Sequence, residues 1–361
     1  MIDAASFSYP ASVVRRRAPL NLLPGDEKCF SHEMVKCFPA VAALNLQDVI
    51  VYGDGLCSVG GRLPPTAALL EPAITLPLRQ RIKTGLLIAA RLMRSIPAAR
   101  CERVEKGLLL TDAYFDGFFH WFGDILPKLE ALRITRANIS DHTILIPESK
   151  YATCAAESFA AYGLPCRVIP FGAAVFAEQL CFIPRLAPTG NYRTELMQGI
   201  RDVFRRRLSG GETGLRLYVS RKAAPKRHLI NEESLAAVLA RYGFTSVCME
   251  RLSFAEQVAL AAECDVLVGL HGAGLVHMLW TRENTTVLEI RGAGDRRNNC
   301  YFSLASDLGH NYYYVSATRR SRFQPSFLSD YVIDVDRFEA ALVQALGNNP
   351  VAGERSCVVP T

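Results

Sequence analysis

Four cations in the second half of the sequence are suited to binding a diphosphate. They lie in one loop, after the apolar run 215–219 and before a helical pattern that starts near residue 231: Arg221, Lys222, Lys226 and Arg227. In a parallel sheet such a loop lies at the carboxyl edge, where ligands bind, and its cations act together with the N-terminus of the next helix. On charge alone, a solvated basic loop is an equally good interpretation.

A glycine turn is the second candidate. The buried strand pattern 266–269 leads into a helix through His271, Gly272, Ala273 and Gly274. The glycines lack a Cβ atom, so an anion can approach the backbone N–H groups, and His271 can donate to a phosphate oxygen. The alternative is a tight strand-to-helix turn with a satisfied histidine. His277 follows His271 by six residues, a poor spacing for two ligands on one helix face, so we expect no metal there.

A carboxylate is expected at the same sheet edge. Glu289 stands at the end of the strand pattern 286–290. Acidic residues in this position of nucleotide-binding folds accept hydrogen bonds from ribose hydroxyls. An ion pair with Arg291 or Arg221 is the competing interpretation.

The first half contains a histidine and an acid that are suited to proton transfer. His120 and Asp124 are four residues apart in a helical pattern over 118–133, so they share a helix face. We expect His120 to act as a general base and Asp124 to orient it, with Asp124 as the second choice for the base. A partly exposed structural pair is the alternative. Pro127 either kinks or ends this helix, or a new helix starts there.

Strand and helix patterns alternate along most of the chain, which predicts parallel sheets with helices on their faces. The alternation runs from residue 107 to 208 and starts afresh at 215, after the polar, glycine-rich stretch 209–214. We therefore expect two Rossmann-like domains facing a central cleft, an α/β fold. The first domain would span 1–210 and the second 211–330. The remaining residues, 331–361, would form a helix over 335–346 and a tail that pack back on the first domain.

Residues 1–105 are hard to interpret. Short apolar runs, among them 48–52 and 73–76, alternate with Gly and Pro turns. The segment 52–61 resembles a phosphate loop only loosely and lacks a following helix pattern, so a β-turn between strands is the better prediction.

The composition is that of an ordinary globular protein with 361 residues, long enough for two cores, and a net charge of +6. Eleven cysteines without a Cys-x-x-Cys pair indicate reduced thiols and a cytoplasmic setting rather than a zinc cluster. We find no signal-peptide pattern and no apolar stretch long enough to span a bilayer. Arg15, Arg16 and Arg17 are expected in a solvated arm that contacts anionic lipid at most.

Taken together, these motifs resemble the catalytic domain of glycosyltransferase family 61. The matching elements in the second half are Arg221, Arg227, Asn231-Glu232, Gly243-Phe244, Glu250, Leu252-Ser253-Phe254, Glu256-Gln257, His271-Gly-Ala-Gly274, Glu289 and the run YFSLASDLGHNYYY. In the first half, FFHWFGDILPKL resembles the family's histidine, acid and Leu-Pro motif. His277 departs from the family, because many members have Asn there.

The resemblance implies a GT-B fold and an inverting transfer of sugar from a nucleotide-diphosphate donor, with UDP expected, to a glycan or lipid-linked glycan. It also implies work without an essential metal, and a setting in bacterial capsule or exopolysaccharide assembly. We expect no cofactor and no nucleic-acid partner, and a location that is cytoplasmic or peripheral to the inner face of the membrane. Arg221, Arg227 and Lys226 would neutralise the leaving diphosphate. Two alternatives stay open, a sugar-nucleotide epimerase of similar fold and a non-catalytic protein that binds sugar nucleotides or glycans.

Overall fold

The chain divides into two compact units in a computed structural model that describes residues 2–55, 57–59, 98–112, 114–208, 214–321 and 323–347. Unit 1 consists of the residues up to Ser12 together with Phe38–Thr189, and unit 2 of Val13–Cys37 together with the residues from Gly190 onward. This division falls at residues 189–190, whereas the sequence predicts a boundary near residue 210. Helix α7 (Thr194–Arg205) belongs to unit 2 because Phe204 packs against Phe254 and Trp280 there. The predicted linker 209–214 lies almost wholly outside the described residues.

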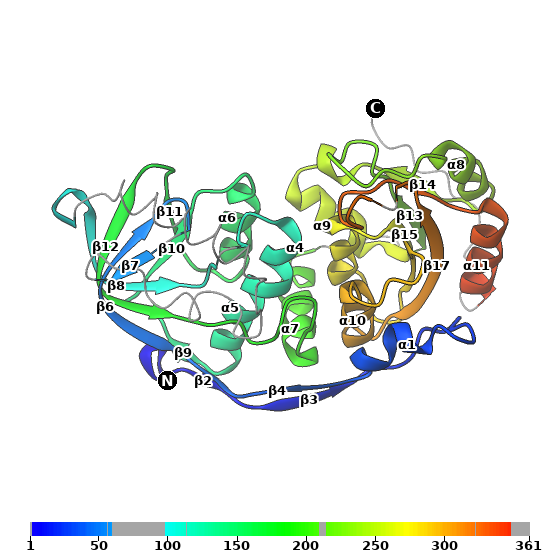
Figure 1. Ribbon diagram of the computed structural model, residues 1–361. Helices are drawn as coiled ribbons and strands as arrows, with labels where there is room; N and C mark the ends of the chain where they lie inside the picture. The colour runs from blue at the N-terminus through cyan, green and yellow to red at the C-terminus, as the bar shows by residue number, and fades with distance from the viewer. Residues whose placement is uncertain are drawn as a thin grey trace. The chain divides into compact units, whose positions relative to one another are not determined.

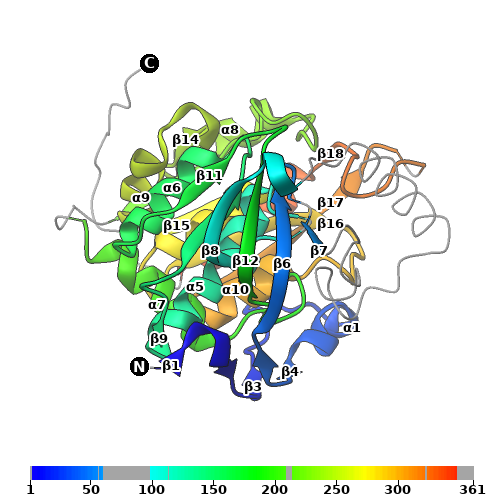
Figure 2. The same cartoon turned by 90° about the vertical axis from the view of Figure 1, so that its left-hand side faces the viewer.

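Unit 1 is built on a six-stranded mixed sheet in the order β11-β10-β8-β12-β6-β7 (Figures 1 and 2). Its strands are β6 (Leu44–Tyr52), β7 (Cys57–Val59), β8 (Glu102–Leu109), β10 (Thr143–Pro147), β11 (Arg167–Ile169) and β12 (Ala174–Phe182). The first four strands in this order are parallel to one another. Strand β6 is antiparallel to both of its neighbours, β12 and β7. The predicted parallel arrangement is confirmed for the part after residue 100. The turn between β6 and β7 also confirms the predicted β-turn, and the run 73–76 lies outside the described residues.

The short elements of unit 1 lie outside that sheet. They are β1 (Ile2–Asp3) paired with β9 (Ala137–Asn138), β2 (Ser8–Tyr9) paired with β5 (Val41–Ala42), and the 3-10 turns Ala4–Ser6 and Ala98–Arg100.

The helix predicted over 118–133 forms, but it changes its winding at its centre. Its parts are α4 (Phe118–His120), the π-helical turn η4 (Trp121–Ile125) and α5 (Leu126–Ile134), and α6 (Ala152–Ala161) follows. Pro127 lacks an N–H group and stands in the first turn of α5, so it interrupts the hydrogen-bond ladder without ending the helix. Wide π turns of this kind occur frequently at functional sites.

Unit 2 contains a second six-stranded sheet, in the order β14-β13-β15-β16-β17-β18. Its strands are β13 (Leu215–Val219), β14 (Thr245–Val247), β15 (Cys264–Leu270), β16 (Thr286–Gly292), β17 (Asn311–Arg319) and β18 (Tyr331–Val332). All but β18 are parallel, as the sequence predicted. The helices are α8 (Glu232–Arg241), α9 (Phe254–Ala262), α10 (Cys300–Asp307) and α11 (Val335–Gly347), with 3-10 helices η5 (Met249–Arg251) and η6 (Ala273–Trp280).

The contacts of helices α11 and α8 bear on two predictions. The helix α11 forms where expected, but its buried residues Phe338 and Leu342 belong to the core of unit 2 and pack against β16 and β17. Asn231 precedes α8 as predicted, yet its side chain bonds the backbone of Ile333 instead of capping the helix. The predicted capping box of Ser253 and Glu256 is confirmed at α9.

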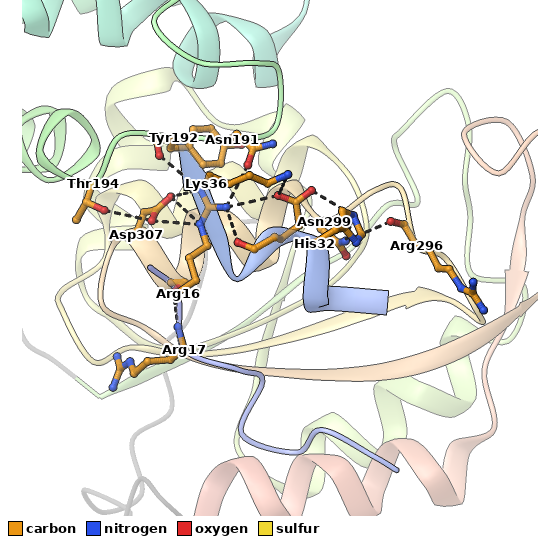
Figure 3. Close-up of polar contacts among 12 residues, drawn as sticks. Arg16, Arg17, His32, Lys36, Asn191, Tyr192, Thr194, Arg296, Asn299 and Asp307 are labelled. Carbon is orange, nitrogen blue, oxygen red and sulfur yellow. Dashed lines mark hydrogen bonds and ion pairs between the residues drawn. The ribbon is translucent and has the colours of Figure 1, made fainter. Parts of the chain in front are cut away.

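The N-terminal segment of unit 2 is a folded part of that unit. It contains α1 (Glu27–Phe30), the 3-10 turn η2 (Ser31–Glu33), and all but one end residue of each of the strands β3 (Ser12–Arg15) and β4 (Val35–Phe38). The expected solvated arm is wrong for Arg16, whose side chain is 0% exposed and forms an ion pair with Asp307 (Figure 3).

Candidate functional site

The two predicted anion motifs meet at one edge of the sheet in unit 2. In chain order its parallel strands run 2-1-3-4-5, so the direction of strand addition reverses between β13 and β15. Ligands of open α/β sheets bind at the carboxyl ends of the strands at such a reversal. Ser220 and Arg221 follow β13, and His271 and Gly272 follow β15. The topology thus places both motifs at the position where this fold binds ligands.

Arg221 is the side chain that joins the two motifs. Its residue is 8% exposed, and its Nη1 atom occupies the space beside Gly272 that a Cβ atom would need. Its Nε donates to the carbonyl of Arg227 (2.9 Å) and its Nη2 to that of Lys226 (2.8 Å). Arg221 therefore shapes the cationic loop with two of its nitrogens and directs the third at the glycine turn.

Arg227 has an unusual conformation in the same loop. Its φ is 61°, in the left-handed region that non-glycine residues adopt at some energetic cost. Its Nε is buried and has no hydrogen-bond partner among the described residues. Such a buried cationic donor indicates a ligand. The other two cations are exposed, and Lys226 places its ammonium 5.7 Å from the ring centre of Phe327.

The positive charges of this loop favour the binding of an anion. Burial lowers the pKa of Arg221, and the neighbouring cation Arg227 lowers it further. A diphosphate bound between the two guanidinium groups would offset both effects, since ionised hydrogen-bond partners attract strongly where water is excluded.

Glu289 is placed differently from our expectation. It is 0% exposed, and its two oxygens bond His271 Nδ1 (2.5 Å) and the hydroxyl of Tyr312 (2.5 Å). Burial opposes its ionisation, but His271, Arg291 and Tyr312 hold the pKa of Glu289 below its usual value. Both oxygens are thus engaged inside the protein, and the contact with ribose stays a prediction. Glu289 instead orients His271, whose ring packs edge-on against Tyr301 at 4.9 Å.

The glycines of the turn are required by close packing. A Cβ atom on Gly274 would lie 2.5 Å from Cγ1 of Val219, the last residue of β13. Ala273 begins η6, so the turn passes directly into a helix with its first N–H groups at the sheet edge. We call Arg221, Arg227, His271, Gly272 and Tyr301 together the anion site of unit 2, because its charges are suited to an anion.

The predicted pair in unit 1 forms. His120 Nδ1 lies 2.7 Å from Asp124 Oδ2, and the Asp124 side chain is 1% exposed while that of His120 is 27% exposed. Because a carboxylate only accepts, Nδ1 carries the proton and Nε2 can accept one. The His120 ring also stacks on Tyr114 at 5.1 Å. The geometry gives the histidine access to a substrate and the acid an orienting position.

A buried charge network behind this pair escaped the sequence analysis. Asp112 follows β8 and accepts from Arg185 Nε (2.7 Å) and Nη2 (2.8 Å), while Lys128 Nζ lies 3.5 Å from Asp112. Arg185 Nη1 also lies 3.4 Å from Asp124. Lys128 is 0% exposed, and burial lowers its pKa. The segment FFHWFGDILPKL contains Lys128, but nothing in the pattern indicated that its ammonium is buried.

Two negative findings apply to the described part of the chain. It contains no group of three or more His, Cys, Asp or Glu residues placed to hold a metal ion. It also contains no helix that is long and apolar enough to cross a membrane.

The sequence profile of Glycosyltransferase 61 matches residues 118–288. This segment, a little under half of the chain, is similar to glycosyltransferase family 61. The matched segment includes both His120 and Asp124 and the whole of the cationic loop and the glycine turn. The similarity therefore covers the His–Asp pair of unit 1, the cationic loop and the glycine turn, while Tyr301 lies outside the matched segment.

Curated relatives are similar to parts of the chain. The EGF domain-specific O-linked N-acetylglucosamine transferase of Drosophila melanogaster is 37% identical over 98 residues, 26% of this chain and 18% of the relative. The enzyme of the same name from Bos taurus is 25% identical over 207 residues, 47% of this chain and 38% of the relative. That of Rattus norvegicus is 26% identical over the same length. The chain thus matches less than two-fifths of the length of these relatives.

Proposed function

We propose that the protein is an inverting glycosyltransferase of the GT-B class that transfers a sugar from a nucleotide-diphosphate donor to a hydroxyl group. The observation that carries the proposal is the position of Arg221 against Gly272, which brings the cationic loop and the glycine turn together at the strand-order reversal. The names of the relatives support N-acetylglucosamine as the sugar and, with it, UDP as the nucleotide.

In this proposal the anion site of unit 2 binds the diphosphate. Arg227 offers its buried Nε, Arg221 its Nη1, and the turn Gly272–Gly274 its backbone N–H groups. His271, oriented by Glu289, donates to a phosphate oxygen. These groups are fixed before the reaction, so they stabilise the charge that develops on the leaving diphosphate without reorganising.

His120 removes the proton from the acceptor hydroxyl. Its Nε2 accepts this proton as the oxygen attacks the anomeric carbon from the side opposite the leaving diphosphate, which inverts the configuration. Asp124 holds the ring and stabilises the imidazolium. The acceptor is a glycan or glycoconjugate hydroxyl in polysaccharide assembly, the setting that we expect from the resemblance. A screen that compares oligosaccharide acceptors with protein acceptors distinguishes this acceptor class from the protein acceptors that the names of the relatives indicate.

Calorimetric titration with UDP, GDP, CMP and dTDP in the presence of EDTA tests the proposal. We expect UDP to bind at one site per chain. It should bind in EDTA, because the arginines of the anion site neutralise the diphosphate without a metal. Binding that requires manganese would contradict the metal-free part of the proposal. Failure of all four nucleotides to bind, with or without metal, would contradict the proposal itself.

A further inference from the structure

The hairpin that joins β17 to β18 in unit 2 exposes three large apolar side chains. The two strands pair antiparallel at the edge of the sheet, and we call residues 319–332 the β17–β18 hairpin (Figure 2). In this hairpin Phe323 is 100% exposed, Phe327 56% and Leu328 44%. Single exposed apolar residues are common on protein surfaces, but a group of them on one loop points to an interaction site. We call these three residues the apolar group of the hairpin.

The backbone of the hairpin is ordered by its own hydrogen bonds. The N–H of Arg320 donates to the carbonyl of Asp330 (2.9 Å), which closes the loop. Within the loop, the N–H groups of Leu328 (3.0 Å) and Ser329 (3.1 Å) both donate to the carbonyl of Pro325. A loop that is ordered before binding loses little conformational entropy when its side chains meet a partner. The apolar group is thus presented on a preorganised loop.

The hairpin is also positively charged. It contains three arginines and a single acid, Asp330, whose Oδ1 already accepts a backbone N–H group (2.8 Å). Arg319 and Arg320 are exposed. The cationic loop adds Lys226, whose ammonium lies 5.7 Å from the ring centre of Phe327. Exposed aromatic and cationic side chains therefore occur together on this surface.

This combination matches the surface of an anionic bilayer. Aromatic side chains enter the boundary between headgroups and acyl chains, and arginines and lysines are attracted to anionic headgroups. A second copy of the hairpin is a poor partner, because it would bring the arginines of both copies together. A protein partner usually covers about 20–30 residues on each side, more than the fourteen residues of this hairpin. The chemistry of the hairpin therefore favours lipid.

We propose that the β17–β18 hairpin binds unit 2 to anionic membranes. The apolar group enters the bilayer interface, and Arg319 and Arg320 contact lipid headgroups. Lys226, beside Phe327, lies in the loop that supplies Arg227 to the anion site, so membrane binding keeps the anion site close to the lipid surface. The inference does not rest on the proposed transfer reaction, because lipid binding needs neither donor nor acceptor.

Sedimentation of the full chain with vesicles tests the apolar group. Vesicles of phosphatidylcholine alone are compared with vesicles of equal parts phosphatidylcholine and phosphatidylglycerol. We expect the chain to bind the anionic vesicles, and Phe323→Ser to weaken this binding at least about tenfold, because one phenylalanine side chain no longer leaves water. The matched control is Phe171→Ser in unit 1, at a residue that is 75% exposed outside the hairpin. It should change the binding by less than about twofold.

A second pair of variants tests the arginines. Arg319→Ser combined with Arg320→Ser should lose at least about tenfold in affinity for the anionic vesicles, since each cation at such a surface contributes severalfold. Arg15→Ser combined with Arg17→Ser removes the same charge from exposed positions of unit 2. This control should lose less than about twofold, because salt screens charges that do not contact the lipid.

Three results would overturn the inference. The first is that the wild-type chain does not bind the anionic vesicles, and the second is an equal loss in a hairpin variant and its control. The third is a wild-type dimer that Phe323→Ser converts to monomers in light scattering, since the hairpin would then be a contact between copies. The changed residues are exposed, so the melting temperatures should stay at the wild-type value. If one hairpin variant does not fold, the other variant and its control decide.

Discussion

The guanidinium group of Arg221 fills the space beside Gly272 where a side chain at position 272 would have to lie. Two motifs that are fifty-one positions apart are thereby packed into one site. The contact explains why the turn needs a glycine at this position although the φ of Gly272, 166°, is open to any residue.

Gly272→Ala should displace the Arg221 guanidinium and weaken UDP binding. The loss should be about 1.5–3 kcal/mol, the value of one charge-assisted hydrogen bond, because Arg221 Nη1 would leave the turn. Gly243→Ala is a control in unit 2, where a Cβ atom would meet nothing within 4 Å. Calorimetric titration of both variants measures the difference, and equal affinities would show that Arg221 does not contact the nucleotide.

Arg227→Ala should weaken UDP binding by a similar amount, about 1.5–3 kcal/mol, because its buried Nε is a donor suited to a phosphate oxygen. Lys222→Ala removes the same charge from an exposed position of the same loop and should cost less than about 1 kcal/mol. If the two variants lose the same affinity, the loop acts only through its total charge, and Arg227 has no specific role.

His120→Ala should fold, bind UDP as the wild type does, and lose at least about a hundredfold in turnover, the usual contribution of a general base. Asp124→Asn should lose less, because the Asp124 side chain is buried and bonded to His120, Thr189 and Arg185. The measurement is kcat at saturating donor sugar. A larger loss in Asp124→Asn would make Asp124 the base, and normal turnover in both would make the pair structural.

Stability should fall as the pH is lowered from 7 to 5. Burial lowers the pKa of His277 and of His310 to about 4, below the value of about 6.5 in an unfolded chain. The unfolded state therefore takes up protons that the folded state does not, and stability is lost as the pH falls. Each histidine should cost about 2 kcal/mol between pH 7 and pH 5.

His277→Asn tests this cause. The variant should show a smaller drop in melting temperature between pH 7 and pH 5 than the wild type, whatever its stability at pH 7. An equal drop in both chains would assign the acid sensitivity to other groups.

The sequence allowed the fold of unit 2 to be predicted in detail, for identifiable reasons. Its parallel strands are buried on both faces and therefore appear as continuous apolar runs, such as Leu215–Val219. Gly243 and Gly309 end α8 and α10 with positive φ values, as the pattern indicated. In unit 1 the apolar run 48–52 indicated only the second half of β6, because none of the first five residues of this strand is buried.

The candidate sites were predictable only where their residues are close in sequence. His120 and Asp124 share one turn, so their contact followed from the helical period. Arg16 pairs with Asp307 across 291 positions, and Arg185 with Asp112 across 73. No local pattern indicates such pairs. Glu289 was assigned to a ligand because its strand position was predictable, while its burial against Tyr312 was not.

Proton NMR of UDP-N-acetylglucosamine, incubated with the protein and EDTA in the absence of an acceptor, tests the proposed inverting transfer most directly. An inverting transferase that uses water in place of its acceptor releases UDP slowly and forms the β-anomer of free N-acetylglucosamine first, since the donor is α-linked. We predict this product, and we predict its rate of formation to fall at least about a hundredfold in His120→Ala. Formation of the α-anomer first, conversion of the donor into an epimeric sugar nucleotide, or an unchanged rate in His120→Ala would contradict the account.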